Sequence, residues 1–198
     1  MSLLIKMNIT ELAKGLKIDE YGIWVNSKTS SISYPEYGNQ MHFLLEDTSF
    51  WFRHRNNCII AAIKQFPPCG QILDIGGGNG FVTRRLIDEG YSTVLLEPDP
   101  VGAYNAKTIR AVPEVICSTF EDIDIPPGSV SAVGCFDVIE HVEEDHFFLK
   151  NIYKILEPGG MLYIVVPAHQ WLWSLHDINV QHYRRYNSEN LIRLLEGM

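Results

Sequence analysis

The sequence is poor in cysteine, and its few cysteines lack the spacing of metal or redox motifs. None of the four forms a C-x-x-C pair, and three sit in or beside apolar runs, as small core residues do. They are Cys58, Cys69, Cys117 and Cys135. We therefore expect reduced thiols and a cytoplasmic protein.

Long hydrophobic runs and excess positive charge are also missing. No stretch approaches the roughly 18 uncharged apolar residues of a membrane span, and the N-terminus has no apolar core of a signal peptide. Lysine and arginine number 16 against 24 acidic residues, a net charge of −8. Such an acidic chain is a poor candidate for binding a phosphate backbone. We expect neither a membrane span nor a nucleic-acid partner.

Glycine, by contrast, is concentrated in one stretch. A short apolar run with an acid near its end, Ile72-Leu73-Asp74-Ile75, leads into Gly76–Gly80, in which four of five residues are glycine, and Phe81 opens a helical pattern. This order predicts a buried strand, a tight turn and a helix start. Glycine accepts positive φ and has no Cβ to hold a ligand off the backbone, and the helix start offers free N–H groups. The stretch predicts a nucleotide-cofactor site.

The spacing of the glycines indicates which cofactor. A dinucleotide fingerprint starting at Gly76 would need a glycine where the chain has Phe81. The pattern Asp74-x-Gly76-x-Gly78-x-Gly80 instead resembles the first motif of the class I S-adenosylmethionine (SAM) dependent methyltransferases. The resemblance implies that the loop, Gly77 included, wraps the methionine end of SAM. It also implies that Asp74 helps to hold the SAM ammonium.

A second acid supports this interpretation. Glu97 follows Asp74 by 23 residues, directly after the apolar run 92–96. A carboxylate at the end of the next strand can accept both ribose hydroxyls of an adenosine. The family resemblance implies the remaining cofactor contacts. Phe120 and Glu121 are expected around the adenine, with Asp122 an equal alternative to Glu121. Pro98 is expected beside Glu97, and Asp137 beside the methionine part.

Strand and helix patterns alternate along the chain. Strands are predicted at 71–75, 92–96, 114–117, 131–136 and 160–166, and helices at 48–66, 79–89, 101–108, 143–156 and 187–196. Alternation of this kind predicts an α/β fold, a Rossmann-like parallel sheet with helices on both faces. We expect residues 48–198 to form the SAM-binding domain. Residues 1–47 are expected to form an N-terminal extension or lid, with a short helix at 8–16 and a hairpin around 26–28.

The class I fold normally continues with two further strands, which the sequence lacks. Either the sequence is a piece of a longer chain, or another chain covers the exposed sheet edge, for which a homodimer is the expected arrangement.

Aromatic and basic residues cluster near the C-terminus. The L-W-S…D…H-x-R-R-Y segment, from Leu172 to Tyr186, resembles one found after the fifth strand in a subgroup of methyltransferases. Loops at this face of a sheet carry specificity, although a packed aromatic loop remains the alternative. We expect the acceptor pocket to contain Trp51, Arg55, Trp173, Tyr183 and Arg184. Arginine binds phosphate and carboxylate bidentately, which favours an anionic acceptor.

The leading hypothesis is a SAM-dependent methyltransferase acting on an oxygen or nitrogen of a small-molecule acceptor. Positioning and desolvation can supply much of the catalysis. If a base takes part, His141 or His182 is expected, because histidine titrates near neutral pH.

Three alternatives stay open. Asp137-x-x-Glu140-His141 with His182 resembles the metal ligands of small-RNA 2′-O-methyltransferases, and Glu140-His141 also resembles quinone-biosynthesis O-methyltransferases; the expected site itself contains no metal. A non-catalytic SAM-binding module is the second alternative. An NAD-dependent oxidoreductase is the third, and Phe81 disfavours it.

Overall fold

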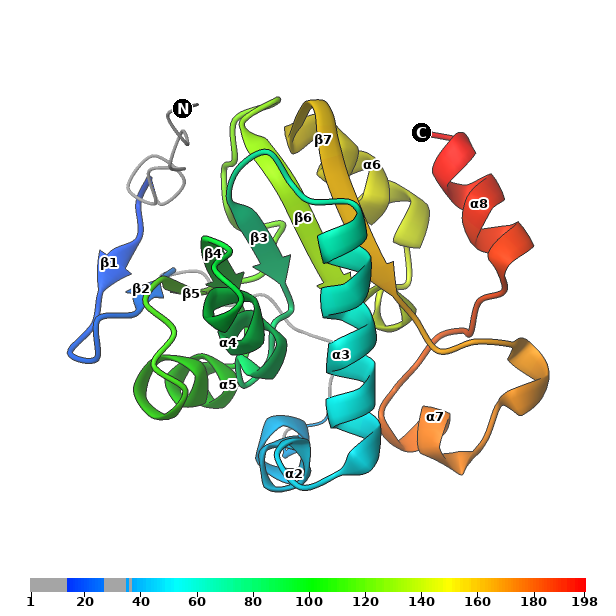
Figure 1. Cartoon of the computed structure of the whole chain (residues 1–198), viewed down its shortest axis with the longest axis horizontal. Coiled ribbons are helices and arrows are strands. Elements are labelled where there is room, and N and C mark those ends of the chain that lie inside the picture. Colours follow the sequence, from blue (N-terminus) through cyan, green and yellow to red (C-terminus); the bar gives the residue numbers. More distant parts are fainter. Residues whose placement is uncertain (1–13, 27–34, 36) are drawn as a thin grey trace.

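The structure, a computed structural model, describes residues 14–26, 35 and 37–198. The described residues form one seven-stranded sheet in the order β1-β2-β5-β4-β3-β6-β7 (Figure 1). The strands are β1 (Lys17–Ile18), β2 (Trp24–Val25), β3 (Ile72–Ile75), β4 (Thr93–Leu96), β5 (Val115–Cys117), β6 (Val130–Phe136) and β7 (Leu156–Val165). β1 is antiparallel to β2 and the other neighbouring pairs are parallel, which confirms the predicted Rossmann-like sheet.

The strand order reverses between β3 and β6. From β3 the chain moves outward to β4 and β5, and it then crosses to β6 and β7 on the other side. Ligands of open α/β sheets bind at such a switch point, outside the carboxyl ends of the strands. The glycine-rich turn after β3 lies at this point.

Helices cover both faces of the sheet. They are α2 (Gly38–Glu46), α3 (Phe50–Gln65), α4 (Phe81–Asp88), α5 (Pro100–Tyr104) with the π-helix η1 (Asn105–Ile109), η2 (Ile139–His141), α6 (Asp145–Ile155), η3 (Gln170–Leu172), α7 (Leu175–Asn179) and α8 (Ser188–Glu196). Side chains alternate along β3: Leu73 and Ile75 pack with α6, whereas Ile72 packs with α3 and α4. Each such buried aliphatic side chain stabilises the fold by about 1.5–3 kcal/mol.

The predicted elements are found with small shifts of their ends. The largest shift concerns the strand predicted at 160–166, which begins earlier, at Leu156, as β7. Val130 pairs with Leu156 but Ala132 pairs with Met161, so the register shifts within this strand. In the N-terminal part, β1 and β2 form a hairpin further upstream than expected and join the sheet beside β5. Most of the helix expected at 8–16, and residues 27–34 of the expected hairpin, lie outside the described residues.

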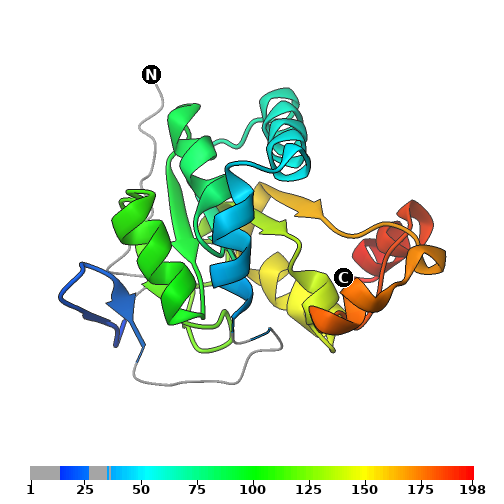
Figure 2. The same ribbon diagram turned by 90° about the horizontal axis from the view of Figure 1, so that it is seen from below.

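Two segments lie beyond the carboxyl ends of the central strands. Figure 2 looks at this edge of the sheet, where α2 crosses the middle and α7, in orange, lies to one side of it. α2 is fastened by Arg110, whose guanidinium pairs with Glu46 at 2.9 Å and with Asp47 at 3.1 Å. Among the described residues, no helix is long and apolar enough to cross a membrane.

Candidate active site

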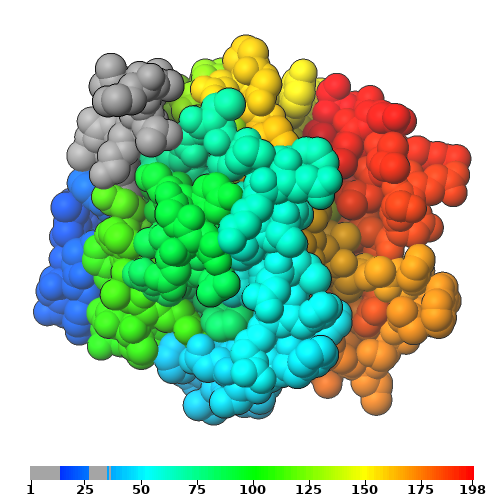
Figure 3. Space-filling view, viewed as in Figure 1, coloured from blue at the N-terminus to red at the C-terminus, as the bar shows by residue number. Residues whose placement is uncertain are grey.

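One cavity of about 1240 Å³ opens at the carboxyl ends of β3, β4 and β6. The glycine-rich turn and the strand ends line one part of it, and α2 and the first half of α3 line another. Residues 168–186, which we call the 168–186 loop, also contribute to the lining. Figure 3 shows this loop, in orange, beside α3, in cyan. The cavity therefore joins segments that are far apart in the sequence.

The backbone of the glycine turn forms the wall of the cavity nearest β3. Gly76 has a φ of +67°, and a Cβ there would lie 2.8 Å from Val138. A Cβ on Gly77 would lie 2.8 Å from Leu95. The turn thus has no room for side chains at these two positions, so its backbone itself lines the cavity.

Glu97 closes the end of β4 and holds this turn in place. Its carboxylate accepts the N–H of Gly78 at 2.7 Å and the N–H of Asp99 at 2.8 Å. The side chain is buried, and burial raises its pKa to about 7. Asn39 of α2 lies over it, with its amide nitrogen 3.5 Å from Glu97 and 2.7 Å from the Asp99 carboxylate.

Asp74 is the last residue but one of β3 and is 1% exposed. The Thr83 hydroxyl donates to Oδ2, but Oδ1 has no hydrogen-bond partner among the described residues. Burial raises the pKa of this carboxyl to about 7. A buried oxygen without a partner costs free energy, so Oδ1 is placed to accept a donor from a ligand.

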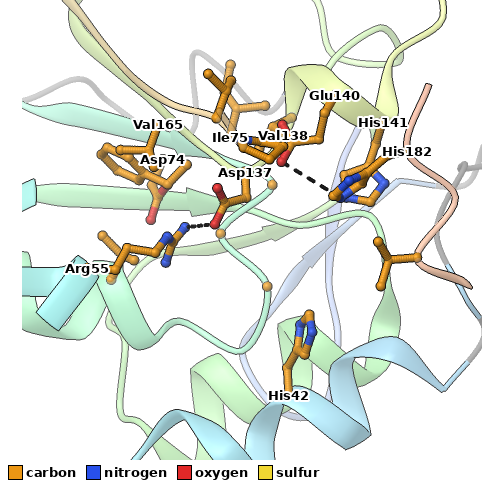
Figure 4. A pocket seen from close by; sticks show the side chains of 18 of the residues that line it. His42, Arg55, Asp74, Ile75, Asp137, Val138, Glu140, His141, Val165 and His182 are labelled. Carbon is orange, nitrogen blue, oxygen red and sulfur yellow. Dashed lines mark ion pairs between the residues drawn. The ribbon is translucent and has the colours of Figure 1, made fainter. Parts of the chain in front are cut away.

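Arg55 and Asp137 form an ion pair across the cavity wall. Arg55 Nη2 lies 2.5 Å from Asp137 Oδ2, and the Arg55 side chain is only 12% exposed (Figure 4). Asp137 follows β6 with a φ of +59°, a conformation rare outside glycine. The strained backbone turns its carboxylate toward α3.

Three side chains at the other end of the cavity converge on one point. Oxygen and nitrogen atoms of Glu140, His141 and His182 all lie within 4.8 Å of one another. Glu140 has no exposed surface, and neither carboxylate oxygen has a hydrogen-bond partner in the described chain. Burial raises its pKa well above the usual range. A group this costly to bury is placed to meet a cation or a donor.

Asp177 orients His182 from the side of the ring opposite Glu140. His182 Nδ1 lies 3.0 Å from Asp177 Oδ1, and Arg185 donates to both Asp177 oxygens at 2.7 and 2.8 Å. Ser174 adds its backbone N–H at 2.8 Å. Arg185, the largest cause, and these further donors hold the pKa of Asp177 well below its usual range. The carboxylate stays ionised and fixes the ring of His182.

Backbone contacts fasten the 168–186 loop at its base and beside η2. Ala168 pairs with Tyr186, and Tyr183 donates its N–H to the carbonyl oxygen of Glu140 at 2.7 Å. The Tyr186 hydroxyl donates to Asp145 at 2.8 Å. The loop therefore holds His182 against Glu140 as part of the folded domain.

Most residues predicted from the sequence do line the cavity. They are Asp74, Gly76, Gly77, Gly78, Glu97, Pro98, Phe120, Glu121, Asp137, His141, His182, Trp51, Arg55 and Tyr183.

Three predicted residues are not among those that line it. Gly80 has a φ of +78° and precedes α4, where a Cβ would lie 2.9 Å from Ala106. Trp173 is half-buried in the 168–186 loop. Arg184 pairs with Asp145 at 2.6 Å and donates to the carbonyl of Glu143.

The contribution of α2 was missed by sequence reasoning. Asn39, His42 and Glu46 all line the cavity, and their spacing places them on one face of the helix. Asn79 donates to the Asn39 carbonyl at 2.8 Å and to Glu46 at 3.2 Å, which joins that face to the glycine turn. A polar face on an otherwise apolar helix was the available signal.

The residues present fit a nucleoside cofactor with an amino-acid tail. The glycine turn admits no Cβ, Glu97 stands at the end of the adjacent strand, and Asp74 offers a buried acceptor without a partner. These groups all line one cavity.

Comparison with known protein families and sequences agrees with this arrangement. Residues 73–164 match the family described as "Methyltransferase domain". A probable S-adenosylmethionine-dependent methyltransferase of Mycolicibacterium smegmatis is 23% identical over 154 residues, 77% of this chain and 60% of that protein. The mitochondrial ubiquinone biosynthesis O-methyltransferase of Mus musculus is 31% identical over 102 residues, 48% of this chain and 28% of that protein. The chain thus spans less than two thirds of either relative.

Solved structures share the fold. A phosphoethanolamine N-methyltransferase of Haemonchus contortus in complex with SAM has a TM-score of 0.65 at 22% identity, covering 83% of this chain and 41% of that one. A SAM-dependent methyltransferase of Thermotoga maritima, described as a possible histamine N-methyltransferase, has a TM-score of 0.62 at 23% identity, covering 81% and 79%. At these identities the likeness concerns the fold alone.

Proposed function

We propose, from the class I SAM-dependent methyltransferase domain that the chain carries at residues 73–164, that it transfers a methyl group to an oxygen or nitrogen of a small-molecule acceptor. SAM is the cofactor of this family. The observation that carries the proposal is the cavity that Asp74, the glycine turn and Glu97 share at the switch point of the sheet.

The chain's own residues divide the binding of the cofactor among them. Glu97 would accept the ribose hydroxyls, and the turn at Gly76–Gly78 would face the methionine end. Phe120 and Glu121, which follow β5, would contact the adenine. Bound SAM supplies an electrophilic methyl group on its sulfonium. The protein contributes position and exclusion of water, which can lower the barrier of an in-line displacement by several kcal/mol, on the order of 7–11 for ideal alignment.

His182 is the proposed base. Because Asp177 accepts at Nδ1, that nitrogen carries the proton and Nε2 presents its lone pair on the side of Glu140. An acceptor hydroxyl or amine could then lose its proton to Nε2 as the new bond to the methyl carbon forms. His141, whose ring centre lies 4.6 Å from that of His182, remains the other candidate.

The charges of the cavity argue for an acceptor without a phosphate or carboxylate. Two arginines of the described chain line the cavity, and each forms an ion pair with a carboxylate: Arg55 with Asp137, and Arg185 with Asp177. Arg184, which does not line the cavity, pairs with Asp145. The rim carries exposed apolar side chains, Trp51 and Leu172 among them. We therefore favour an uncharged or aromatic body bearing the nucleophile over the anionic acceptor that the arginines suggested.

Calorimetry with SAM tests the cofactor claim. Glu97→Ala removes two charge-assisted hydrogen bonds to the ribose, each worth about 1.5–3 kcal/mol, so affinity should fall at least tenfold. Glu121→Ala is the matched comparison, since it changes a carboxylate on the adenine side. Turnover of phenols and amines then separates an enzyme from a non-catalytic binding module. Failure of the wild type to bind millimolar SAM, or binding of NAD instead, would remove the proposal.

A metal-assisted methyltransferase is the second candidate, favoured by the Glu140, His141 and His182 cluster. One carboxylate and two imidazoles suit Zn²⁺ or a similar divalent ion, and Asp177 would orient His182 as outer partners of metal ligands do. Titration with Zn²⁺ or Mn²⁺ should show one site in the wild type and a large loss in Glu140→Gln. Turnover that a chelator leaves unchanged would exclude this candidate.

The cytoplasmic location, a homodimer and the absence of a nucleic-acid partner stay predictions from the sequence. Size-exclusion chromatography with light scattering tests the second of these directly.

A further inference from the structure

Exposed apolar side chains gather in two segments of the chain. Of the 19 large hydrophobic side chains that are exposed in the described residues, ten belong to residues 37–51 and 171–178. We call these ten side chains the apolar rim. The most exposed of them are Leu44, Phe50, Trp51, Trp171 and Leu175. Single exposed apolar residues are ordinary on a protein surface, whereas a concentration of them marks an interaction site.

The two segments lie at the same end of the domain. The first includes α2 and the first turn of α3, and the second includes α7. Figure 1 shows these elements beyond the carboxyl ends of β3 and β6. Three members of the apolar rim, Leu45, Trp51 and Leu172, are exposed to solvent and also line the cavity. The apolar rim therefore continues from the outer surface into the mouth of the cavity.

The charged side chains of the two segments are paired. Glu46 and Asp47 share the guanidinium of Arg110, at 2.9 and 3.1 Å. Asp177 has no exposed surface and is bound by Arg185. No other residue of the two segments is Asp, Glu, Lys or Arg. The net charge of −8 is therefore carried by other parts of the chain, and the apolar rim is close to neutral.

Whatever covers the apolar rim must still admit an acceptor to the cavity. A protein partner, or a second copy of this chain, would close the mouth and keep the acceptor out. A lipid bilayer would bury the same side chains, because Trp, Phe and Leu favour the boundary between headgroups and acyl chains. It would also deliver small molecules through the face that it covers.

We propose that the apolar rim docks on the surface of a lipid bilayer, and that the acceptor is a molecule carried in that bilayer. Its hydrocarbon tail stays in the lipid or the cavity mouth while its nucleophilic head reaches the cofactor. The acceptor part of the proposal rests on the proposed function, whereas docking itself does not require SAM.

Flotation with phosphatidylcholine vesicles over a range of lipid concentrations tests the docking. The wild type should float with the vesicles. Phe50→Ser should weaken binding roughly tenfold, since burial of one aromatic side chain contributes about that factor. Phe66→Ser is the matched control, because Phe66 is 56% exposed and lies at the other end of the same helix, about 24 Å away at 1.5 Å per residue. It should bind as the wild type does.

Two further measurements use other members of the apolar rim. Leu175→Ser should weaken binding like Phe50→Ser, which provides a second reading if one variant is unstable. Vesicles of brominated phosphatidylcholine should quench tryptophan fluorescence in the wild type and much less in the double variant Trp51→Phe, Trp171→Phe, because the remaining Trp24 and Trp173 are half-buried. Adding phosphatidylglycerol should not strengthen binding, since the apolar rim is close to neutral and the chain is acidic.

The possible failures are distinguishable. A wild type that binds SAM in calorimetry but does not float with vesicles would overturn the docking and leave the proposed function in place. Equal flotation of the wild type, Phe50→Ser and Leu175→Ser would also overturn it. A dimer in light scattering that Phe50→Ser dissociates, in a protein that ignores vesicles, would assign the apolar rim to a second copy. A wild type that floats but does not bind SAM would overturn the proposed function and with it the lipid-borne acceptor.

Discussion

Asp177 accepts a hydrogen bond from His182 at 3.0 Å, with the carboxylate fully buried inside the 168–186 loop. The opposite nitrogen of the ring points toward Glu140, 4.0 Å away. This relationship places an oriented imidazole at the end of the cavity and makes two residues of the loop directly testable.

Replacing His182 by Ala should lower turnover with little change in SAM affinity. Turnover should fall because a positioned base typically contributes 10²–10⁴-fold to the rate. SAM affinity should change little because His182 is expected to contact the acceptor and not the cofactor. Single-turnover kinetics measure the rate of methyl transfer, and calorimetry measures the affinity for SAM. His169→Ala, on the same loop but outside the lining, is the control. Equal turnover in both variants would assign the base elsewhere.

Asp177→Leu should destabilise the fold. Removing one partner of a buried ion pair leaves the other uncompensated, at a typical cost of about 3–5 kcal/mol; here Arg185 would lose two hydrogen bonds. Glu189→Leu breaks the exposed pair with Arg193 and should cost less than about 1 kcal/mol. Urea denaturation measures both variants. Equal midpoints would show that the Asp177 pair does not hold the loop.

Stability should fall as pH rises toward neutrality. Burial raises the pKa of Asp74 from 3.8, and that of Glu97 from 4.5, to about 7 in each case. The folded state therefore keeps protons that the unfolded chain has released, and the stabilisation is lost as pH rises through the folded pKa. Scanning calorimetry of the ligand-free protein between pH 5 and 8 should show that the melting temperature falls as pH rises, and that it falls less steeply in Asp74→Asn. Identical slopes would exclude Asp74 as the titrating group.

Gly76→Ala should impair both the fold and SAM binding. The new Cβ would lie 2.8 Å from Val138, and the alanine would have to adopt a φ of +67°. Gly90→Ala carries the conformational strain alone, because its φ is +92° and nothing lies within 4 Å; that strain costs about 1–2 kcal/mol. We expect calorimetry to show weaker SAM binding only in Gly76→Ala. Comparable SAM affinities would mean that the turn can shift without harm.

Local sequence patterns were sufficient for the sheet and the cofactor side of the cavity. Apart from Asp74, Ile72–Ile75 is apolar because the strand is buried on both faces, and the glycines that follow favour a tight turn. Glu97 could be placed because an acid that ends a buried strand meets its neighbours at the same edge of a parallel sheet. Each of these features depends on residues close together in the chain.

Contacts between distant segments could not be predicted in the same way. Asn39 meets Glu97 across 58 positions, and the pairing depends on how α2 crosses the sheet edge. Arg184 and Arg185 are adjacent and look equivalent in the sequence, yet one pairs with Asp145 and the other with Asp177. Only the folded loop determines which arginine reaches the cavity.

The family match ends at residue 164, and the 168–186 loop begins just beyond it. The loop is joined at its base by Ala168 and Tyr186, so its interior can change in length or composition while the strands keep their register. On the proposed function, exchange of this one insert would change the contacts to the acceptor while leaving in place the residues of β3 and β4 that are proposed to hold the methyl donor. The acceptor would then be a property of the loop and the methyl donor a property of the sheet.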